Sequence, residues 1–341
     1  TMKVVLFLGA GFSKAIFNQK IQSELIDDFL TAPESEDFVK KFPKEFVELT
    51  STFNDIELIM SHYLNLGYPE PYIEGDETLY NKRFIVFLRM ALAIYFREKF
   101  KNVGYDYYES ESEYLIHDYF HGYGVVPDDL SVITTNYDLG AERAVETIKG
   151  MGSYFYPGFQ KVVDTRDKVP IMKLHGSINW IEARGTLSRI GFANNTRKEI
   201  ITDILDDLTF HEFTLQKDGT KYAPVLVPFF YQKQLWSKIN QRWWGKRFDE
   251  LWHQAFKALI DADLILFWGY SLPNADHHMF TLLQTALTRS NANIQIIDKL
   301  NKNSPETNLM KLAYLSRVSE PDKLEVSKHG LSEYLRSIVE T

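Results

Sequence analysis

Four short polar segments each follow an apolar run, and together they hold the residues best suited to chemistry. They are Gly9-Ala10-Gly11-Phe12-Ser13, Thr134-Thr135-Asn136-Tyr137-Asp138, Lys173-Leu174-His175-Gly176-Ser177 and Gly269-Tyr270-Ser271-Leu272-Pro273. A further apolar run ends at Asp298. Glycine turns, amides, imidazoles, hydroxyls and carboxylates of this kind bind phosphates and ribose hydroxyls and transfer protons.

The first segment is a candidate for holding a diphosphate. Gly9 and Gly11 allow a sharp turn and a close approach of the backbone to a phosphate, which the start of the next helix also favours. Ser13 is suited to donate to a phosphate oxygen or to cap that helix. Lys14 stands where a dinucleotide fingerprint has its third glycine, and no G-x-x-x-x-G-K-[ST] occurs. A purely structural turn therefore stays open, and a P-loop nucleotidase is disfavoured.

The other segments offer proton-transfer and hydroxyl-binding groups, each with a structural alternative. Asn136 is suited to hold a water molecule or a ribose hydroxyl, and Asp138 either joins the same site or caps the helix that follows. His175 is suited to act as a general base, since the ordinary pKa of histidine is about 6.5, or it is a hydrogen-bonded structural residue. Asp298 is suited to accept from both hydroxyls of a ribose, or it caps a helix or turn.

The elements before these segments must bring them together. Short apolar runs predict buried strands at Lys3–Leu8, Leu130–Thr134, Val169–Leu174, Leu264–Trp268 and Asn293–Ile297. Helical patterns lie between them, notably Phe248–Ile260, so the sequence predicts an α/β fold with a Rossmann-like doubly wound parallel sheet. Because ligands of such sheets bind beyond the carboxyl ends of the strands, we expect one nucleotide site there.

Two insertions interrupt this alternation within a single predicted domain covering residues 1–341. A large helical insertion is expected at about 31–126, and a minor polar one, helical or looped, at about 182–222. The C-terminal segment 301–341 is expected to add a strand and a helix, Leu331–Val339. The Rossmann core is expected in three stretches, about 1–30, 127–181 and 223–300.

Composition limits the other classes of function. The chain has no cysteine, which excludes disulfides, thiolate catalysis and a cysteine-based zinc site. Its net charge of −8 argues against general attraction to nucleic acid. The basic and aromatic stretch Lys233–Arg247 leaves local nucleic-acid contact open, beside the simpler reading of an amphipathic helix. No apolar run reaches the roughly 18 residues of a membrane span. The start of the chain fits neither a signal nor a transit peptide, so a cytoplasmic protein is expected.

In their order along the chain, the G-A-G-x-S, T-x-N-x-D, L-H-G-S and G-x-S-L segments, with an acidic end to a late strand, resemble the sirtuin family. Gly9–Lys14, Asn54–Glu57, Leu174–Trp180 and Gly269–Asp276 resemble more narrowly the bacterial sirtuin-like domains of antiviral defence systems, which hydrolyse NAD. Deacetylating sirtuins carry a four-cysteine zinc module, and a proline–aspartate–phenylalanine–arginine segment follows their glycine turn. This chain has no cysteine, and Ala15–Gln19 replaces that segment, so a protein deacylase is the least favoured alternative.

The resemblance implies that NAD is a substrate, cleaved to nicotinamide and ADP-ribose without zinc or another metal. It assigns catalysis to Asn136 and His175, and NAD binding to Gly9, Ala10, Gly11, Ser13, Asp138, Gly269, Ser271 and Asp298. It also implies a homo-oligomer that acts against phage and is activated by oligomerisation or by a partner such as a HerA-like ATPase or an Argonaute-like protein. The alternatives are a module that senses NAD or ADP-ribose without cleaving it, and a subunit of a nucleic-acid-processing defence complex.

Overall fold

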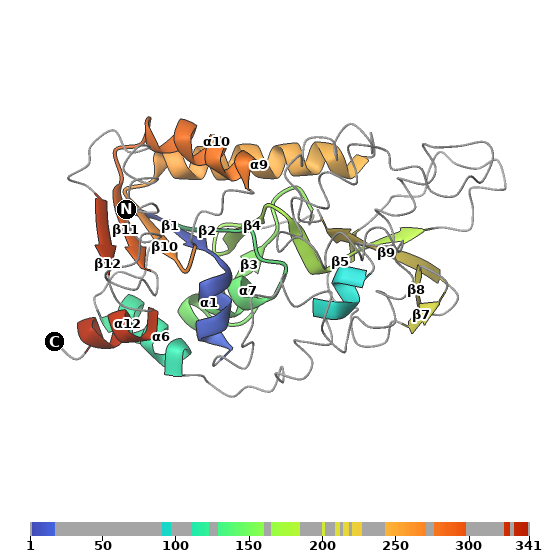
Figure 1. Ribbon diagram of the computed structural model, residues 1–341, viewed down its shortest axis with the longest axis horizontal. Helices are drawn as coiled ribbons and strands as arrows, with labels where there is room; N and C mark the ends of the chain where they lie inside the picture. The colour runs from blue at the N-terminus through green and yellow to red at the C-terminus, as the bar shows by residue number, and fades with distance from the viewer. Residues whose placement is uncertain are drawn as a thin grey trace, which may run out of the picture. The chain divides into compact units, whose positions relative to one another are not determined.

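The chain divides into two compact units. The computed structural model describes residues 2–17, 91–96, 111–122, 129–159, 165–184, 200–201, 209–211, 214–217, 220–226, 243–270, 276–297, 324–327 and 331–339. One unit, here called the core unit, comprises Thr1–Gln22, Val103–Leu174 and Arg242–Thr341. The other, here called the insertion unit, comprises Ser23–Asn102 and His175–Gln241. Each is described by its own elements (Figure 1).

The core unit contains a seven-stranded sheet in the order β12-β11-β10-β1-β2-β4-β3, and all its paired strands run parallel. The strands are β1 Lys3–Leu8, β2 Asp129–Thr134, β3 Tyr154–Phe155, β4 Val169–Lys173, β10 Leu264–Trp268, β11 Asn293–Ile297 and β12 Leu324–Ser327. The predicted strands are confirmed, including one in the C-terminal segment. β3 was not predicted, because its two residues are too few to show a periodicity.

The central strands end level with one another. Leu8 at the end of β1 pairs with Thr134 on β2 and with Trp268 on β10. After the exposed Lys3, every residue of β1 is buried, which explains the continuous apolar run in place of an alternating one. The polar segments after β1, β2 and β10 therefore start at the same edge of the sheet.

Helices cover both faces of the sheet, as Figure 1 shows. Those on one face pack among themselves: α1 Ala10–Ile16, α6 Glu111–Gly122, α7 Gly140–Lys149 and α12 Leu331–Val339. On the other face α9, Trp243–Asp261, packs against α10, His277–Leu287, and against β1 and β4. The doubly wound α/β fold is thus confirmed. Among the described helices, none is both long and apolar enough to cross a membrane.

The order of the strands reverses beside β1. From β1 the chain adds β2 and β4 toward one edge, and it later adds β10, β11 and β12 toward the other. The helices that follow β1 and β10, α1 and α10, accordingly lie on opposite faces. In open α/β sheets this switch point is where ligands bind, outside the carboxyl ends of the strands.

The insertion unit contains an antiparallel five-stranded sheet in the order β6-β5-β9-β8-β7. Its strands are β5 Gly176–Arg184, β6 Ile200–Ile201, β7 Thr209–His211, β8 Thr214–Lys217 and β9 Thr220–Leu226. For the described residues, the expectation of a helix or loop over 182–222 is therefore wrong. The Asp218-Gly219 pair between β8 and β9 is a hairpin signal when strand-like segments flank it, and the sequence interpretation took it only as a turn.

Of the predicted helical insertion at about 31–126, the structure describes residues 91–96, which are helical, and α6. α6 belongs to the core unit, where it packs against α7 and α12. The remaining residues of this insertion, including Asn54–Glu57, lie outside the described residues, and the boundaries of the domain and its insertions stay predictions.

Candidate functional site

Two glycine-containing turns meet where β1 and β10 end. The N–H of Gly9 donates to the Trp268 carbonyl oxygen at 3.0 Å, and the N–H of Gly11 donates to the Gly269 carbonyl oxygen at 2.9 Å. Gly269 has a φ of 63°, and a Cβ there would lie 2.2 Å from the backbone nitrogen of Phe12. A Cβ on Gly9 would lie 2.3 Å from the Gly269 oxygen. Backbone packing between the turns therefore requires these glycines whether or not a ligand is bound, and the two N–H groups are already used. Ala10 between them is exposed.

The short helix α1 is held in place by packing. Its seven residues are too few for a stable isolated helix. Phe12 is fully buried and stacks on Trp268 with ring centroids 6.1 Å apart, and Ile16 is also buried. A Cβ on Gly140 of α7 would lie 3.2 Å from Ser13 Oγ, so the glycine permits the close approach of α1 and α7. This packing fixes the position of Ser13.

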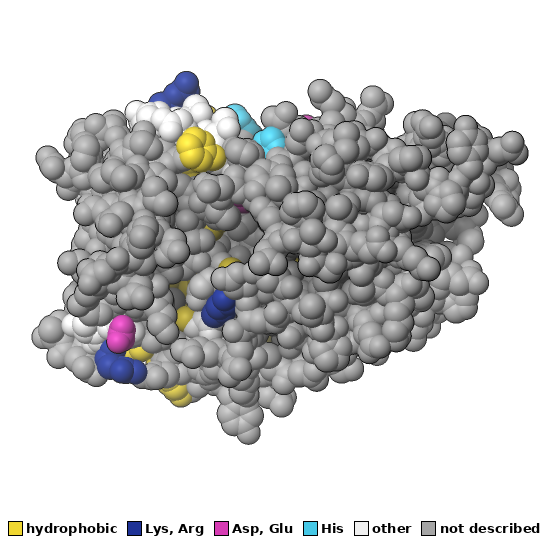
Figure 2. All heavy atoms as spheres, in the orientation of Figure 1, with side chains coloured by type: hydrophobic (Ala, Val, Ile, Leu, Met, Phe, Trp, Pro, Cys, Tyr) yellow, Lys and Arg dark blue, Asp and Glu magenta, His cyan; other side chains and the backbone are white. Residues whose placement is uncertain are grey.

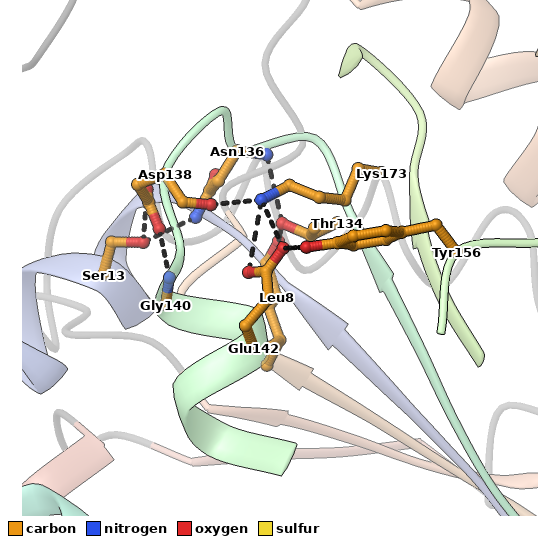
Figure 3. A network of polar contacts seen from close by, with 9 residues as sticks. All are labelled: Leu8, Ser13, Thr134, Asn136, Asp138, Gly140, Glu142, Tyr156 and Lys173. Carbon is orange, nitrogen blue, oxygen red and sulfur yellow. Dashed lines mark hydrogen bonds and ion pairs between the residues drawn. The ribbon is translucent and has the colours of Figure 1, made fainter. Parts of the chain in front are cut away.

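Asn136 is held by the turn between β1 and α1 (Figure 3). Its Nδ2 donates to the carbonyl oxygen of Gly9 at 2.7 Å and to Ser13 Oγ at 2.8 Å. Its backbone N–H donates to Thr134 Oγ1, which itself donates to the Leu8 carbonyl oxygen. Because a carbonyl oxygen only accepts, the Asn136 atom facing Gly9 must be the amide nitrogen. Both amide hydrogens are thus used. The side-chain oxygen has no hydrogen-bond partner among the described residues and is the atom left for a ligand.

Asp138 is buried, and both its carboxylate oxygens bind groups of the protein. Oδ1 accepts from the N–H of Gly140, the first residue of α7, at 2.8 Å, and Oδ2 accepts from the Ser13 hydroxyl at 2.8 Å. Burial raises the pKa of Asp138, while the Lys173 ammonium and these two hydrogen bonds oppose the rise. The geometry favours the structural alternative for Asp138. It also makes Ser13, which is fully buried, a link between Asp138 and Asn136 rather than a donor to phosphate.

A second polar cluster contacts the same loop, and the sequence interpretation gave it no role. Lys173 at the end of β4, Glu142 on α7 and Tyr156 after β3 are all buried and joined by hydrogen bonds (Figure 3). The available signal was a lysine closing an otherwise apolar strand, because a lysine in that position needs a buried partner or a route to solvent.

His175 is the first residue of the insertion unit and is buried, with 6% of its surface exposed. Its predecessor, Leu174, donates its N–H to the Thr134 carbonyl oxygen at 2.9 Å. Gly176 after it has a φ of 85°, and a Cβ there would lie 2.2 Å from the Val225 carbonyl oxygen on β9. The glycine of this His-Gly pair is thus required by packing. The catalytic role of His175 stays a prediction.

The remaining predicted site residues are not all described. Ser271 and Asp298 lie outside the described residues, so their roles in NAD binding stay predictions. Of the basic stretch Lys233–Arg247, the structure describes the backbone of 243–247, which begins α9, and the side chain of Arg247. The Arg247 guanidinium donates to the Gly158 carbonyl oxygen at 2.5 Å, and partial burial lowers its pKa. This bond joins α9 to the residues after β3 within the core unit.

A hollow of about 420 Å³ lies at the opposite ends of the strands. Its lining includes Lys3 and Asp129 at the starts of β1 and β2, and Glu250 and Lys257 on α9. Volume alone would make it a candidate site, but its exposed charges of both signs indicate no single class of ligand. The edge with converging hydrogen bonds around Asn136 is the stronger candidate.

Exposed hydrophobic side chains among the described residues are scattered. They are Met2, Tyr114, Met151 and Phe280. On the face drawn in Figure 2, the hydrophobic side chains appear as separate spots. Within this part of the chain they do not build a continuous apolar patch of the kind that marks a stable subunit interface.

Comparison with known proteins gives one family match. Residues 130–221, which include Asn136, Lys173 and His175, match the SIR2-like domain family. No protein among the curated sequences matches this chain. Similar solved structures include a sirtuin studied for substrate affinity, with 14% identity, coverage of 99% of this chain and 93% of that chain, and a TM-score of 0.44.

Two further structures are similar to the same extent. Sir2 with a p53 peptide and NAD+ has 13% identity, coverage of 99% of this chain and 92% of that chain, and a TM-score of 0.42. A substituted Sir2 homologue with 2′-O-acetyl-ADP-ribose has 14% identity, coverage of 99% of this chain and 90% of that chain, and a TM-score of 0.40. Scores at this level add nothing to the fold assignment, which rests on the strand order and pairing of the core unit.

Proposed function

We propose that this protein binds NAD at the carboxyl end of its parallel sheet and hydrolyses the nicotinamide–ribose bond, releasing nicotinamide and ADP-ribose. The observation that carries the proposal is the fixed Asn136 side chain, whose Nδ2 is used twice and whose oxygen is left, within the described residues, as an acceptor. Water and ribose hydroxyls donate hydrogen bonds, whereas phosphate oxygens accept them. Asn136 therefore suits a ribose or an attacking water molecule rather than a diphosphate.

The family match supports NAD as the ligand. Asn136 and His175 both fall within the residues that match the SIR2-like domain family, and the sirtuin resemblance implies NAD as a substrate. The switch point beside β1 supports a dinucleotide at the same edge of the sheet. The absence of cysteine from the sequence supports cleavage of NAD over zinc-dependent protein deacylation.

In the proposed reaction, nicotinamide leaves as its ribose carbon gains positive charge, and water then adds to that carbon. The carbon–nitrogen bond breaks, a carbon–oxygen bond forms, and one proton is released. Asn136 orients the ribose hydroxyl or the water through its oxygen. His175 takes the proton as a general base. Proton transfer to a positioned base accelerates a reaction by about 10²–10⁴-fold.

The other assignments concern binding. The turn of Gly9, Ala10 and Gly11 lies alongside the diphosphate, and Ser13 and Asp138 hold Asn136 instead of contacting the ligand. Gly269 shapes the neighbouring turn. Ser271 assists with the diphosphate and Asp298 accepts from the adenosine ribose, both on the strength of the family resemblance.

A sensor of NAD or ADP-ribose is the second candidate, and the burial of His175 is the observation that favours it. A base with 6% exposure has limited access to bulk water for returning its proton. Binding alone does not need such an exchange.

Incubation of the purified protein with NAD, followed by chromatography, separates the two candidates. Equal amounts of nicotinamide and ADP-ribose support hydrolysis. Stabilisation against unfolding without product, both for the protein alone and with each candidate partner present, supports the sensor, since a ligand at about 100 times its Kd stabilises by about 2.7 kcal/mol. Absence of both effects contradicts both candidates.

The biological setting proposed here rests on the family resemblance. We propose a cytoplasmic antiphage effector that acts as a homo-oligomer and is activated by oligomerisation or by a partner, such as a HerA-like ATPase or an Argonaute-like protein. The alternative of a subunit of a nucleic-acid-processing complex predicts salt-sensitive DNA binding that is lost when Arg242 and Lys246 are replaced together. Light scattering of the purified protein and nicotinamide release with each partner test the first setting.

A further inference from the structure

We infer that Lys173, together with Glu142 and Tyr156, positions the loop that carries Asn136. These three residues are here called the clamp. Its effect on NAD cleavage rests on the proposed function, whereas its effect on the loop does not. The clamp residues touch no substrate in this proposal and act through Asn136.

Lys173 is fully buried, which is unusual for a lysine, and its ammonium is saturated with acceptors. It contacts Glu142 Oε1 at 2.9 Å and Oε2 at 3.2 Å, and it donates to the backbone carbonyl oxygen of Asp138. An ammonium has three hydrogens, and these three contacts use them. One of the three contacts is to the Asp138 carbonyl oxygen, which belongs to the loop between β2 and α7.

Glu142 fixes the other end of the clamp. It lies in the first turn of α7, where a negative charge is favoured by the helix dipole. Besides Lys173, its Oε1 accepts the hydroxyl of Tyr156 at 2.6 Å, and Tyr156 is itself buried. The clamp thereby ties together the end of β4, the start of α7 and the residue after β3.

The clamp reaches Asn136 through two further hydrogen bonds. Lys173 holds the backbone of Asp138, whose carboxylate accepts from Ser13, and Ser13 Oγ accepts from Asn136 Nδ2. Figure 3 shows the clamp and Ser13 on opposite sides of Asp138. Loss of the clamp frees the Asp138 backbone, and the set of bonds that orients the Asn136 side chain then loses one of its supports.

Stability alone gives a weak reason for this arrangement. Replacing a buried ion pair by apolar residues of similar volume is often neutral or stabilising, whereas removing one partner leaves a buried charge unpaired. Replacing the whole clamp therefore separates its positioning role from its contribution to stability.

The test compares the wild type with the triple variant Lys173→Met, Glu142→Met and Tyr156→Phe, in which all three polar side chains become apolar together. We expect its thermal unfolding to stay close to that of the wild type. Hydrogen exchange at the amides of Asn136 and Gly140 should become about tenfold faster, as loss of about one hydrogen bond allows. The kcat for NAD should fall by about 100-fold with a smaller change in KM, since misplacement of an orienting group acts mainly on the reacting geometry.

A matched control removes another ion pair from the same helix. Arg143 on α7 pairs with Glu113 on α6 at 2.5 Å, and this side-chain pair lies outside the bonds that join Lys173, Glu142 and Tyr156 to Asp138. The double variant Arg143→Met and Glu113→Met should leave exchange at Asn136 and Gly140 unchanged.

Unchanged exchange at Asn136 and Gly140 in the folded triple variant would overturn the inference. If the triple variant does not fold, Tyr156→Phe takes its place, and exchange faster by about twofold or more is then required, with unchanged exchange again overturning the inference. If the wild type does not cleave NAD, the exchange result still decides the inference, while the proposed function fails separately.

Discussion

Replacing Gly269 by alanine tests the packing of the two turns that frame the candidate site. Gly269 has a φ of 63°. An added Cβ would lie 2.2 Å from the Phe12 nitrogen, 2.5 Å from the Gly11 carbonyl carbon and 2.7 Å from the Gly11 Cα. All three are backbone atoms, so no side chain can rotate to relieve the overlap. The change must either move α1 or deform the turn after β10.

The expected cost has two parts. A residue with a Cβ at positive φ lowers the free energy of unfolding by about 1–2 kcal/mol, and overpacking of a well-packed region lowers it by about 1–3 kcal/mol. The sum is about 2–5 kcal/mol. At about 2–4 °C per kcal/mol, the Tm should fall by about 4–20 °C.

Gly152→Ala is the matched control. Gly152 has a φ of 69°, close to that of Gly269, but a Cβ there would meet nothing within 4 Å. Its replacement should cost only the backbone part, about 1–2 kcal/mol. Urea unfolding of both variants, with an unchanged m-value, measures the difference. Equal losses of stability in the two variants would refute the close packing of the turns.

Three further substitutions test the roles of single side chains. His175→Ala should leave NAD binding near normal and reduce nicotinamide release by at least about 100-fold, and unchanged NAD consumption would remove His175 from the mechanism. Ser13→Ala should lower the unfolding free energy by about 1–3 kcal/mol in urea, because a buried oxygen of Asp138 loses its donor, and a loss below about 0.5 kcal/mol would contradict the buried link to Asn136. Asp138→Asn tests the raised pKa of Asp138. The folded state binds this proton more tightly than the unfolded state, so above pH 3.8 the wild type should lose stability relative to the variant as pH rises through the raised pKa. Urea unfolding from pH 4 upward measures this trend, and a difference that stays constant or grows in favour of the wild type would contradict it.

The fold was largely readable from the sequence because the central strands are buried on both faces. Runs such as Lys3–Leu8 are apolar without interruption, and each stops at a glycine or a polar residue at the same edge of the sheet. β3 escaped prediction because it is only two residues long. The antiparallel sheet of the insertion unit was not predicted, because the region's polar residues and turn signals were interpreted as a helix or a loop.

The candidate site was predictable in its residue types but not in its contacts. Asn136 stood out as an amide at a strand end, yet its bond to the Gly9 oxygen joins residues 127 positions apart, and no local spacing reveals such a pair. Gly9 was interpreted as room for a phosphate, and Gly269 as an NAD-binding residue by resemblance, whereas in the structure both serve the contact between two turns. Lys173 was visible as a charge closing an apolar strand, but its partners on α7 and after β3 depend on the assembled sheet.

The central claim is that the fixed acceptor of Asn136 serves the cleavage of NAD. The most direct test is the rate of nicotinamide release from NAD by the wild type and by Asn136→Ala, measured on samples with the same thermal unfolding. The account predicts equimolar nicotinamide and ADP-ribose from the wild type and a rate at least about 100-fold lower from the variant. Equal rates from both proteins would contradict it.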